Sequence, residues 1–396
     1  MTNYQFPLMQ ENFTSSDIKA VKQLLDSTDI FTQSKKVLEF EKKWSEWLGV
    51  KYSVFVNSGA SANYLSIRLL KILHGNDWEI IVPSFTWISD IISIIDHGFK
   101  PIFVDIDLHN LGASEKQIIE KVTSKTLCVF LTHAQGFNAL SDNLLNYLTL
   151  KKIYLIEDVC ESHGATFREK KCGSFGILSN FSFYYAHHMT TIEGGMICTD
   201  DEGIYDILRS LRSHGMVREM KNEERKASLV EKYPNLSPQF IFLYPGLNMR
   251  SNEISAVLGI SQLERLDSNI LKRRENFSFF IEYIDSNLFF TNFDSVGNSN
   301  YAFPLILKEQ DFLLRDKLEL LMQRNGIEYR RGNVGGGNQL LQPYLEDFFD
   351  KQYLNGNFKN VDHVHNFGYY VGNYPGLTKE KIKKLCTILN GLSNGE

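Results

Sequence analysis

The sequence lacks the features that mark several large classes of protein. It has only five cysteines in 396 residues, and no two have CxxC spacing, which argues against a disulfide framework and a structural zinc site. No stretch approaches the roughly 18 consecutive apolar residues of a membrane-spanning helix, so no membrane partner is expected. The N-terminal segment lacks the basic and apolar regions of a secretory signal, and we expect a cytoplasmic protein.

A surplus of positive charge is also missing. The chain carries 42 Lys and Arg against 47 Asp and Glu, a formal net charge of -5, without charged blocks. A protein that binds nucleic acid needs a basic surface, so nucleic acid is not an expected partner. Apolar residues make up 43% of the chain, which is enough for a sizeable core in one large domain and a smaller one.

Short apolar runs alternate with helix-period segments in the first 250 or so residues. Because each run is apolar on both faces, the pattern predicts strands buried in a mostly parallel sheet, with helices between them. The predicted strands are 79–83, 101–105, 127–132, 153–158, 181–185 and 195–199, and the predicted crossover helices are 61–73 and 114–122.

The pattern changes at about residue 253. It predicts one long amphipathic helix from 253 past Arg274, a strand at 301–307, a helix at 310–324 that ends at Asn325-Gly326, and a last helix at 378–392. We therefore expect a large α/β domain over 1–252 and a smaller C-terminal α+β domain over 253–396.

Two segments carry candidate chemistry at predicted strand ends. The small residues of 56–63, between an apolar run and a helix, offer backbone N–H groups and a helix dipole to a phosphate, although such turns also occur without a ligand. Asp158 ends a predicted buried strand, where a carboxylate can pair with a protonated pyridine nitrogen or simply cap the next helix.

A third segment, 182–189, contains Ser182, a candidate phosphate donor, and the adjacent pair His187 and His188. A histidine can act as a base near neutral pH. A metal site is the alternative, but adjacent residues on a strand point to opposite faces, and no Cys or carboxylate cluster completes a ligand set nearby. We therefore expect no metal.

Together these segments resemble the nucleotide-sugar aminotransferase and dehydratase family, which has the aspartate aminotransferase-like fold of fold type I PLP enzymes. The resemblance implies PLP or PMP as cofactor, a keto-sugar (in general nucleotide-linked) and L-glutamate as substrates, and a role in deoxysugar biosynthesis of the lipopolysaccharide O-antigen kind. The matching segments, in family order over about 10–275, are VNSGASAN, VPSFTW, FVDID, IEDVCESHGATF, SFYYAHHMTTIEGG and YPGLNMRSNEISAVLG; the C-terminal GIEYRR and VGNYPGLT match more loosely.

The resemblance also implies roles for individual residues. Asp158 matches the acid at the pyridine nitrogen, Trp87 matches the aromatic ring that stacks on the cofactor, and Glu161 stands where aminotransferases carry a glutamine that faces the ring hydroxyl. The family's phosphate site maps to Ala60, Ser61 and Ser182. Asn248, assigned to the cofactor, and Arg250 match residues that reach the partner subunit's active site, which implies a homodimer with shared sites. Arg250 and His214 are assigned to the substrate, and His163 and His188 receive no role.

The sequence departs from the family's aminotransferases at residue 187. Those enzymes have Ser-Phe, three residues, then the lysine that bonds to the cofactor; here His187 takes that place, and no lysine occurs between Lys171 and Lys221. The substitution is similar to that of the family's 3-dehydratase branch. It implies that glutamate converts PLP to PMP, that PMP condenses with a C4 ketone, and that His187 removes the C4′ proton as the C3 hydroxyl leaves.

Two alternatives stay open. The first is a sugar aminotransferase that works without the lysine, favoured by the unusual stretch Arg330-Arg331-Gly332 and Gly335-Gly336-Gly337-Asn338, and the second is a non-catalytic PLP-binding sensor. An iron–sulfur dehydratase is not expected because no cysteine lies in or near 246–252. Structural roles are expected for Cys160, Cys172, His133, His363 and His365, the last two on a strand or loop at 362–367.

Overall fold

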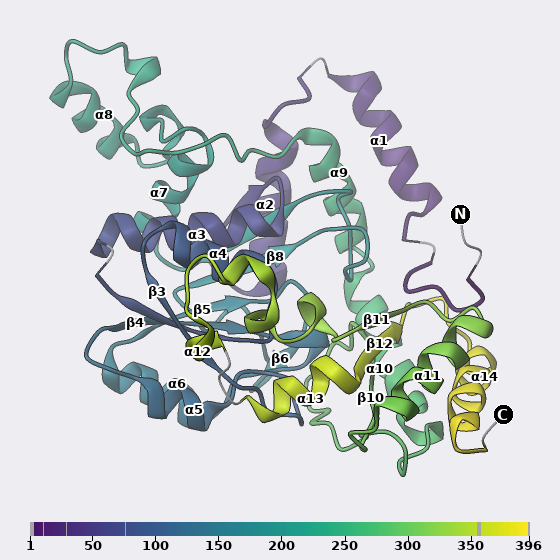
Figure 1. The fold of residues 1–396 in the computed structure, drawn as a ribbon. Helices are drawn as coiled ribbons and strands as arrows, with labels where there is room; N and C mark the ends of the chain where they lie inside the picture. The colour runs from purple at the N-terminus through teal and green to yellow at the C-terminus, as the bar shows by residue number, and fades with distance from the viewer. Residues whose placement is uncertain (1–3, 11, 29, 76, 355–357, 395–396) are drawn as a thin grey trace.

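The computed structural model describes residues 4–10, 12–28, 30–75, 77–354 and 358–394. Its centre is a seven-stranded sheet in the order β1-β9-β8-β5-β4-β2-β3 (Figure 1). All neighbouring pairs are parallel except those that β9 makes, which are antiparallel on both sides. The strands are β1 Tyr52–Val56, β2 Glu79–Pro83, β3 Lys100–Val104, β4 Thr126–Thr132, β5 Tyr154–Asp158, β8 Leu178–Ser182 and β9 Gly195–Thr199.

Helices cover both faces of this sheet. The chain's helices are α1 Ser15–Ser27, α2 Lys35–Leu48, α3 Gly59–His74, α4 Ile88–Asp96, α5 Glu115–Lys121, α6 Asp142–Lys151, α7 Glu202–Arg212, α8 Glu223–Lys232, α9 Glu253–Leu263, α10 Leu266–Tyr283, α11 Phe312–Arg324, α12 Lys351–Leu354, α13 Lys359–Phe367 and α14 Lys379–Asn390. Apolar residues of α3, α4 and α7 form the core on one face, and those of α2, α5 and α6 form the core on the other. Val54 and Val56 of β1 join the first core while Phe55 joins the second, because successive strand side chains point to opposite faces.

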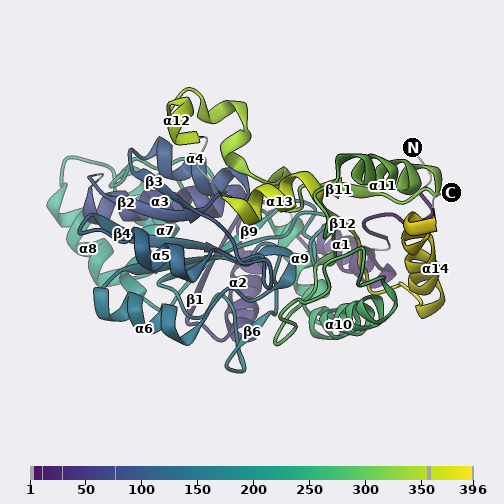
Figure 2. The same ribbon diagram turned by 60° about the horizontal axis from the view of Figure 1, so that its bottom comes forward.

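A second, three-stranded antiparallel sheet lies at one end of the molecule (Figure 2). It has the order β10-β12-β11, with β10 Ala302–Ile306, β11 Tyr329–Arg331 and β12 Gly368–Gly372. Helix α13 packs against β11 and β12, and α14 packs against α10 and α11. A short hairpin joins β6 Thr166–Phe167 to β7 Lys170–Lys171. The N-terminal segment also reaches the small sheet's region, because Phe6 N donates to Gly326 O at 3.1 Å.

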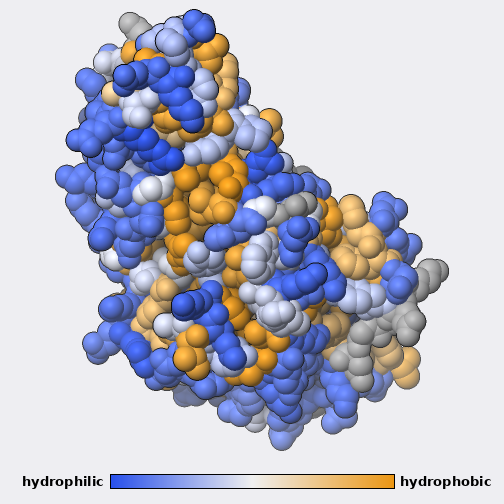
Figure 3. Space-filling view, turned by 90° about the vertical axis from the view of Figure 1, so that its left-hand side faces the viewer, coloured by the Kyte–Doolittle hydropathy of each residue, from blue (hydrophilic) through white to orange (hydrophobic). Residues whose placement is uncertain are grey.

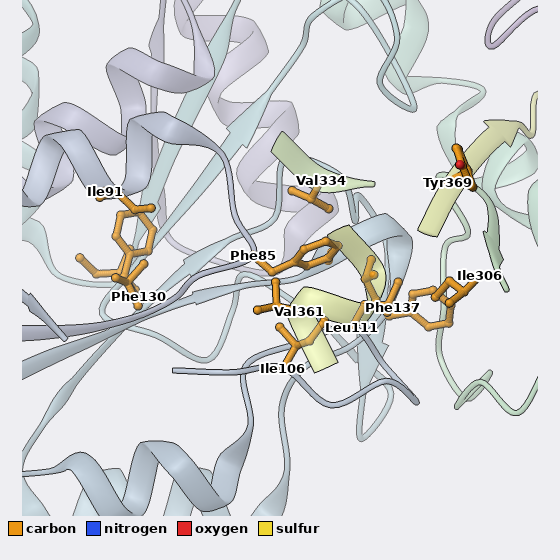
Figure 4. Close-up of a cluster of buried hydrophobic side chains, with 14 of the residues drawn as sticks. Phe85, Ile91, Ile106, Leu111, Phe130, Phe137, Ile306, Val334, Val361 and Tyr369 are labelled. Atoms are coloured by element: carbon orange, nitrogen blue, oxygen red, sulfur yellow. The ribbon is translucent and has the colours of Figure 1, made fainter. Parts of the chain in front are cut away.

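Helix α9 comes directly after the proposed domain boundary at 252/253, yet it packs against α1 and α2 of the N-terminal part. The division into 1–252 and 253–396 itself stays a prediction. The core is continuous between the two sheets: Phe85, which follows β2, lies close to Val334 and Val361 from the C-terminal part (Figure 4). Within the described residues, no helix has the length and apolar character needed to cross a membrane.

Most of the predicted elements are confirmed. Strands 79–83 and 195–199 have the predicted bounds. The strands predicted at 127–132 and 153–158 differ from β4 and β5 by one residue at the start, and the one predicted at 101–105 is shifted by one residue from β3. The predicted strand at 181–185 is misplaced, because β8 ends at Ser182 and the chain then turns, with His187 N donating to Tyr184 O. The aromatic residues after Ser182 have high β-propensity, which is why the sequence predicts that the strand continues through them.

Two C-terminal predictions are wrong. The single helix from 253 past Arg274 is two helices, α9 and α10, because Arg265 leaves the helical conformation at φ -112° and ψ 2°. His363 and His365 lie in α13, not on a strand or loop. Two residues span only about half a turn of helix, so the spacing of the two histidines does not by itself distinguish a strand from a helix.

The fold predicts a strong effect of a side chain at Gly195, the first residue of β9. A Cβ atom there would collide with Ser58 O and lie 2.7 Å from Gly59 N, at the start of α3. We expect Gly195→Ala to lower the free energy of unfolding by about 1–3 kcal/mol, measured by urea denaturation. Gly391→Ala is the matched control, since a Cβ there meets nothing within 4 Å. Equal stability of the two variants would contradict this packing.

Candidate functional site

The candidate site lies along one edge of the seven-stranded sheet. The turn 57–61 follows β1, Trp87 follows β2, Asp158 ends β5 and Ser182 ends β8. Because β1, β2, β5 and β8 point in the same direction, their carboxyl ends meet at one edge. That edge is where ligands bind in open α/β sheets.

The start of α3 and Ser182 form an anion-binding corner. Ser58 caps the helix and accepts from Ser61 N at 3.1 Å, and Ser61 Oγ donates to Asn57 Oδ1 at 2.6 Å. Gly59 lies so close to β8 that a Cβ there would be 2.6 Å from Ser182 Cβ. The first N–H groups of a helix have no partner inside the helix and carry its positive dipole end, so this corner suits a phosphate.

Asp158 lies deeper at the same edge. Its carboxylate accepts from Cys160 N at 2.8 Å and from Asn63 Nδ2 at 3.2 Å, and Asn63 belongs to α3. Trp87, at the start of α4, has 56% of its surface exposed, whereas Trp44 is fully buried. An exposed indole at the same sheet edge as a buried carboxylate can stack on a flat ring whose nitrogen reaches the acid.

Glu161 is held by Gln135 in the loop after β4. Gln135 N donates to Glu161 Oε2 at 2.9 Å, and Gln135 Nε2 lies 3.3 Å from the same oxygen. Gln135 has φ 55°, which is uncommon for a residue with a side chain and positions its N–H toward the carboxylate. Desolvation, with a contribution from the Asp158 charge, raises the pKa of Glu161 to about 7.

Three histidines form a cluster with Tyr301, whose phenol is close enough to Glu161 to be affected by its charge. The His163 ring centroid lies 6.0 Å from that of His187 and 5.4 Å from that of His188, and Tyr301 is 5.7 Å from His187. Desolvation, together with the charge of Arg273, lowers the pKa of His187 to about 4. The same desolvation holds the pKa values of His163 and His188 well below the usual range. All three rings are therefore neutral at pH 7.

His187 combines a neutral ring with an open side. It lies in the turn after β8 rather than on a strand and is partly exposed, while its Nδ1 is buried without a hydrogen-bond partner among the described residues. His188 is buried, and its Nε2 donates to Ser299 O at 3.2 Å, which gives it a structural contact. His187 is thus the histidine that can take up a proton from a ligand.

Arg273 supplies positive charge to this cluster from α10. Its guanidinium is buried and donates to the carbonyl oxygens of Tyr301, at 2.8 Å, and Asn373. Within the described chain it makes no ion pair with a carboxylate. This uncompensated charge opposes a second positive charge on the neighbouring imidazoles.

Residues 248–250 and His214 lie near the end of β1. Asn57 N donates to Met249 O at 3.0 Å, and Asn248 Oδ1 accepts from Arg250 Nε at 3.2 Å. Asn248 and His214 are exposed, and His214 has φ 63°. Their assigned contacts with cofactor and substrate stay predictions.

Other polar residues named from the sequence have contacts within the protein. His133 Nε2 lies 3.1 Å from Glu157 Oε2 in the core, Cys172 is buried, and His363 Nε2 donates to Leu307 O at 2.8 Å. His365 Nδ1 accepts from Asn338 N at 3.3 Å. No cluster of three or more His, Cys, Asp or Glu side chains suited to a metal ion occurs in the part of the chain that the structure describes.

Sequence reasoning missed several residues at this edge: Asn63, Thr86, Asp90, Thr132, Gln135, Arg273 and Tyr301. Asn63 lies within the quoted VNSGASAN segment, four residues after Gly59, and a helix beginning at Gly59 would have placed both on one face. Arg273 and Tyr301 come from the C-terminal part, and no local pattern connects them with β5 or β8.

The strand-end site and the layered sheet define an aspartate aminotransferase-like enzyme. A sequence model of the DegT/DnrJ/EryC1/StrS aminotransferase family matches residues 11–390, and the chain belongs to that family. Both the family and the fold predicted from the sequence are thereby confirmed.

Individual relatives match along nearly the whole chain. The GDP-4-keto-6-deoxy-D-mannose 3-dehydratase of Yersinia pseudotuberculosis is 33% identical over 391 residues, 97% of this chain and 98% of that one. A solved Escherichia coli GDP-4-keto-6-deoxy-D-mannose-3-dehydratase with bound hydrated PLP has a TM-score of 0.87 at 31% identity, covering 98% and 99% of the chains. A solved GDP-4-keto-6-deoxymannose-3-dehydratase with a trapped PLP-glutamate geminal diamine has a TM-score of 0.86 at 30% identity, covering 97% of this chain and 100% of that one.

The histidine cluster predicts acid sensitivity. The folded-state pKa of each histidine is below the unfolded value of 6.5, so at lower pH the unfolded chain binds protons that the folded chain does not. The free energy of unfolding should therefore fall as the pH drops from 6.5 toward about 4, by up to about 1.4 kcal/mol per pH unit for each histidine. Replacing His163, whose ring is fully buried, by Met should make this loss shallower.

The measurement is urea denaturation of cofactor-free protein across this pH range. His109→Gln, at an exposed histidine far along the chain from the cluster, is the control. An identical pH slope for wild type and His163→Met would contradict the assignment of a neutral, buried ring to His163.

Proposed function

We propose that the protein is a PLP/PMP-dependent 3-dehydratase of a 4-keto-6-deoxy nucleotide sugar, with L-glutamate as the amino donor. The observation that carries this proposal is His187. It replaces the lysine of the family's aminotransferases, its ring is neutral, and it is partly exposed next to His163 and Tyr301 in the turn that follows Ser182. The dehydratase names of relatives that match nearly the full chain support the same activity.

The residues present fit the cofactor. The phosphate would bind at Ala60, Ser61 and Ser182, where the start of α3 meets β8. The exposed Trp87 indole would cover one ring face, and Asp158 would accept from the ring nitrogen. Glu161 would face the ring hydroxyl, and its pKa of about 7 lets it act as donor or acceptor near neutral pH.

When bound, the cofactor supplies an amino group that can condense with the sugar ketone and a ring that accepts electron density. The protein's own part is to hold that ring and to move protons. His187 would carry the proton at the C4′ carbon, because its neutral ring offers a free acceptor nitrogen. Asp158 would keep the ring nitrogen protonated, and Arg273 would keep His187 neutral between transfers.

The missing lysine favours elimination over amination. A lysine at 187 could bond to the cofactor aldehyde and displace the aminated sugar, whereas imidazole forms no stable bond of that kind. The aminotransferase alternative is supported by the unusual 330–338 stretch and by relatives such as the GDP-perosamine synthase of Escherichia coli O157:H7, which is 30% identical but matches only 71% of this chain. The sensor alternative gives the neutral His187 no role. We therefore place dehydration first.

We also propose a cytoplasmic homodimer with shared active sites. Large apolar side chains are exposed on the segment that links α8 to α9, including Leu236, Phe240, Phe242 and Leu247. Figure 3 shows apolar side chains gathered on the same side of the molecule as the protruding α8. A second copy that covered this face would remove apolar surface from water and bring Asn248 and Arg250 to the partner's site.

The product of the reaction tests the proposed function. We expect purified protein with PLP, L-glutamate and GDP-4-keto-6-deoxy-D-mannose or a related nucleotide sugar to release a 3-deoxy-4-keto sugar and ammonia. Mass spectrometry separates this product from an amino sugar, which would establish the aminotransferase instead. No change in either sugar or cofactor absorbance would favour the sensor.

His187→Lys is the matched variant for this experiment. We expect it to retain the cofactor through denaturation after borohydride reduction and to lose dehydration by about 10²-fold or more. Unchanged dehydration would remove His187 from the reaction.

A further inference from the structure

A second carboxyl group, Asp90, lies beside Asp158. Asp90 is fully buried in the first turn of α4, three residues after Trp87. Asn63 Nδ2 lies 2.5 Å from Asp90 Oδ1 and 3.2 Å from Asp158 Oδ2, so one amide group from α3 bridges the two acids. The catalytic role proposed above uses only Asp158.

The other oxygen of Asp90 belongs to a triangle of oxygen atoms. Asp90 Oδ2, Thr86 Oγ1 and Thr132 Oγ1 all lie within hydrogen-bond distance of one another, at 2.6 Å between the two threonines and 3.2 Å from Thr132 to Asp90, with Thr86 closest to Asp90. Three contacts need three hydrogen atoms, and the two threonines supply two. A hydrogen on Asp90 completes the ring, in which each oxygen donates once and accepts once.

The charges around Asp90 point the same way. The titratable groups that face it are Asp158 at the end of β5, Cys160 just after β5, and Tyr344 of the short turn Pro343–Leu345. In the described part of the chain, no Lys, Arg or His bonds to either acid. Burial raises the pKa of Asp90 well above its usual value, and the charge of Asp158 raises it further.

We propose that Asp90 keeps its proton in the folded protein and is a positioning residue that leaves Asp158 as the only negative charge at the cofactor's ring nitrogen. Two ionised carboxylates that share one amide in the core would drive a proton onto one of them. Because the two threonines hold the proton on Asp90, Asp158 is not the protonated member of the pair. Asp158 then stays ionised and can hold the ring nitrogen; this role rests on the proposed function.

The pH dependence of stability in cofactor-free protein tests the protonation. A folded pKa above the unfolded value of 3.8 means that Asp90 costs stability increasingly as the pH rises above about 4. Asp90→Asn keeps the shape and cannot ionise. We therefore expect the stability of Asp90→Asn relative to wild type, measured by its urea denaturation midpoint, to increase from about pH 4 to pH 8. The ratio of the two unfolding constants should change by up to about tenfold per pH unit.

Asp17 is the matched control. It is also fully buried in the first turn of a helix; burial opposes its ionisation, but bonds from Arg265 and Ser261 outweigh this and lower its pKa. Asp17→Asn should lose stability relative to wild type as the pH rises to about 4, the opposite sign, and the difference should stay level above that pH, because both folded and unfolded Asp17 are then ionised. A flat or falling difference for Asp90→Asn would show an ionised Asp90 and overturn the proposal.

A second measurement covers the case in which Asp90→Asn does not fold. In a Glu161→Gln background, which removes the other acid with a raised pKa at this edge, the infrared C=O stretch of a protonated carboxyl should be present at pH 7. Its absence would contradict a proton on Asp90.

Cofactor binding separates this proposal from the proposed function. We expect Asp90→Asn to bind PLP within about threefold of wild type, because the amide can still donate, and Asp158→Asn to bind at least tenfold more weakly. If wild type binds no PLP, the proposed function fails while the pH experiment still decides the state of Asp90. If Asp90→Asn loses PLP as strongly as Asp158→Asn does, the positioning role fails although the proposed function stands.

Discussion

The site depends on the contact between one face of α3 and the ends of β5 and β8. Gly59 packs against Ser182, Asn63 reaches Asp158, and Ser66 Oγ donates to Asn180 Oδ1 at 2.7 Å. These residues are four and three positions apart, so they form one stripe along the helix. The same stripe therefore positions both the anion-binding corner at the start of α3 and the Asp158 carboxylate farther along the helix. Helix α3 thus sets the separation between the sites proposed for the cofactor's phosphate and its ring nitrogen.

Charge is distributed so that few groups at this edge are ionised. The three histidines are neutral because burial and Arg273 oppose protonation, and the pKa of Glu161 is raised toward neutrality. With a proton on Asp90, Asp158 is the remaining fixed negative charge beside Asn63. A buried site with one carboxylate and neutral bases suits a reaction in which protons move and the protein makes no covalent bond.

The sequence was sufficient to predict the layered fold and the residues at strand ends. Strand ends can be predicted because buried runs are short, apolar and followed by polar or small residues, as at Asp158 and the turn after Val56. The position of His187 was identified through the family resemblance, but its turn was misread as a strand because Phe183 and the tyrosines after it have high β-propensity.

The remaining site residues could not be predicted because their partners are distant in the chain. Arg273 is held by the backbone carbonyl oxygens of Tyr301 and Asn373. Because every residue has a backbone carbonyl, such partners cannot be recognised from the sequence. Asp90 lies outside every element and motif predicted from the sequence. Only the tertiary structure shows that it points inward, to Thr132 and Asn63 from other elements.

The most direct test of the account is proton transfer at the cofactor's C4′ carbon. Protein incubated with PLP and L-glutamate in deuterium oxide should yield PMP with one deuterium at C4′, and His187→Asn should slow that incorporation by about 10²–10⁴-fold while still binding PLP. Incorporation at the wild-type rate in His187→Asn would contradict the central claim that this histidine, in place of a lysine, moves the proton.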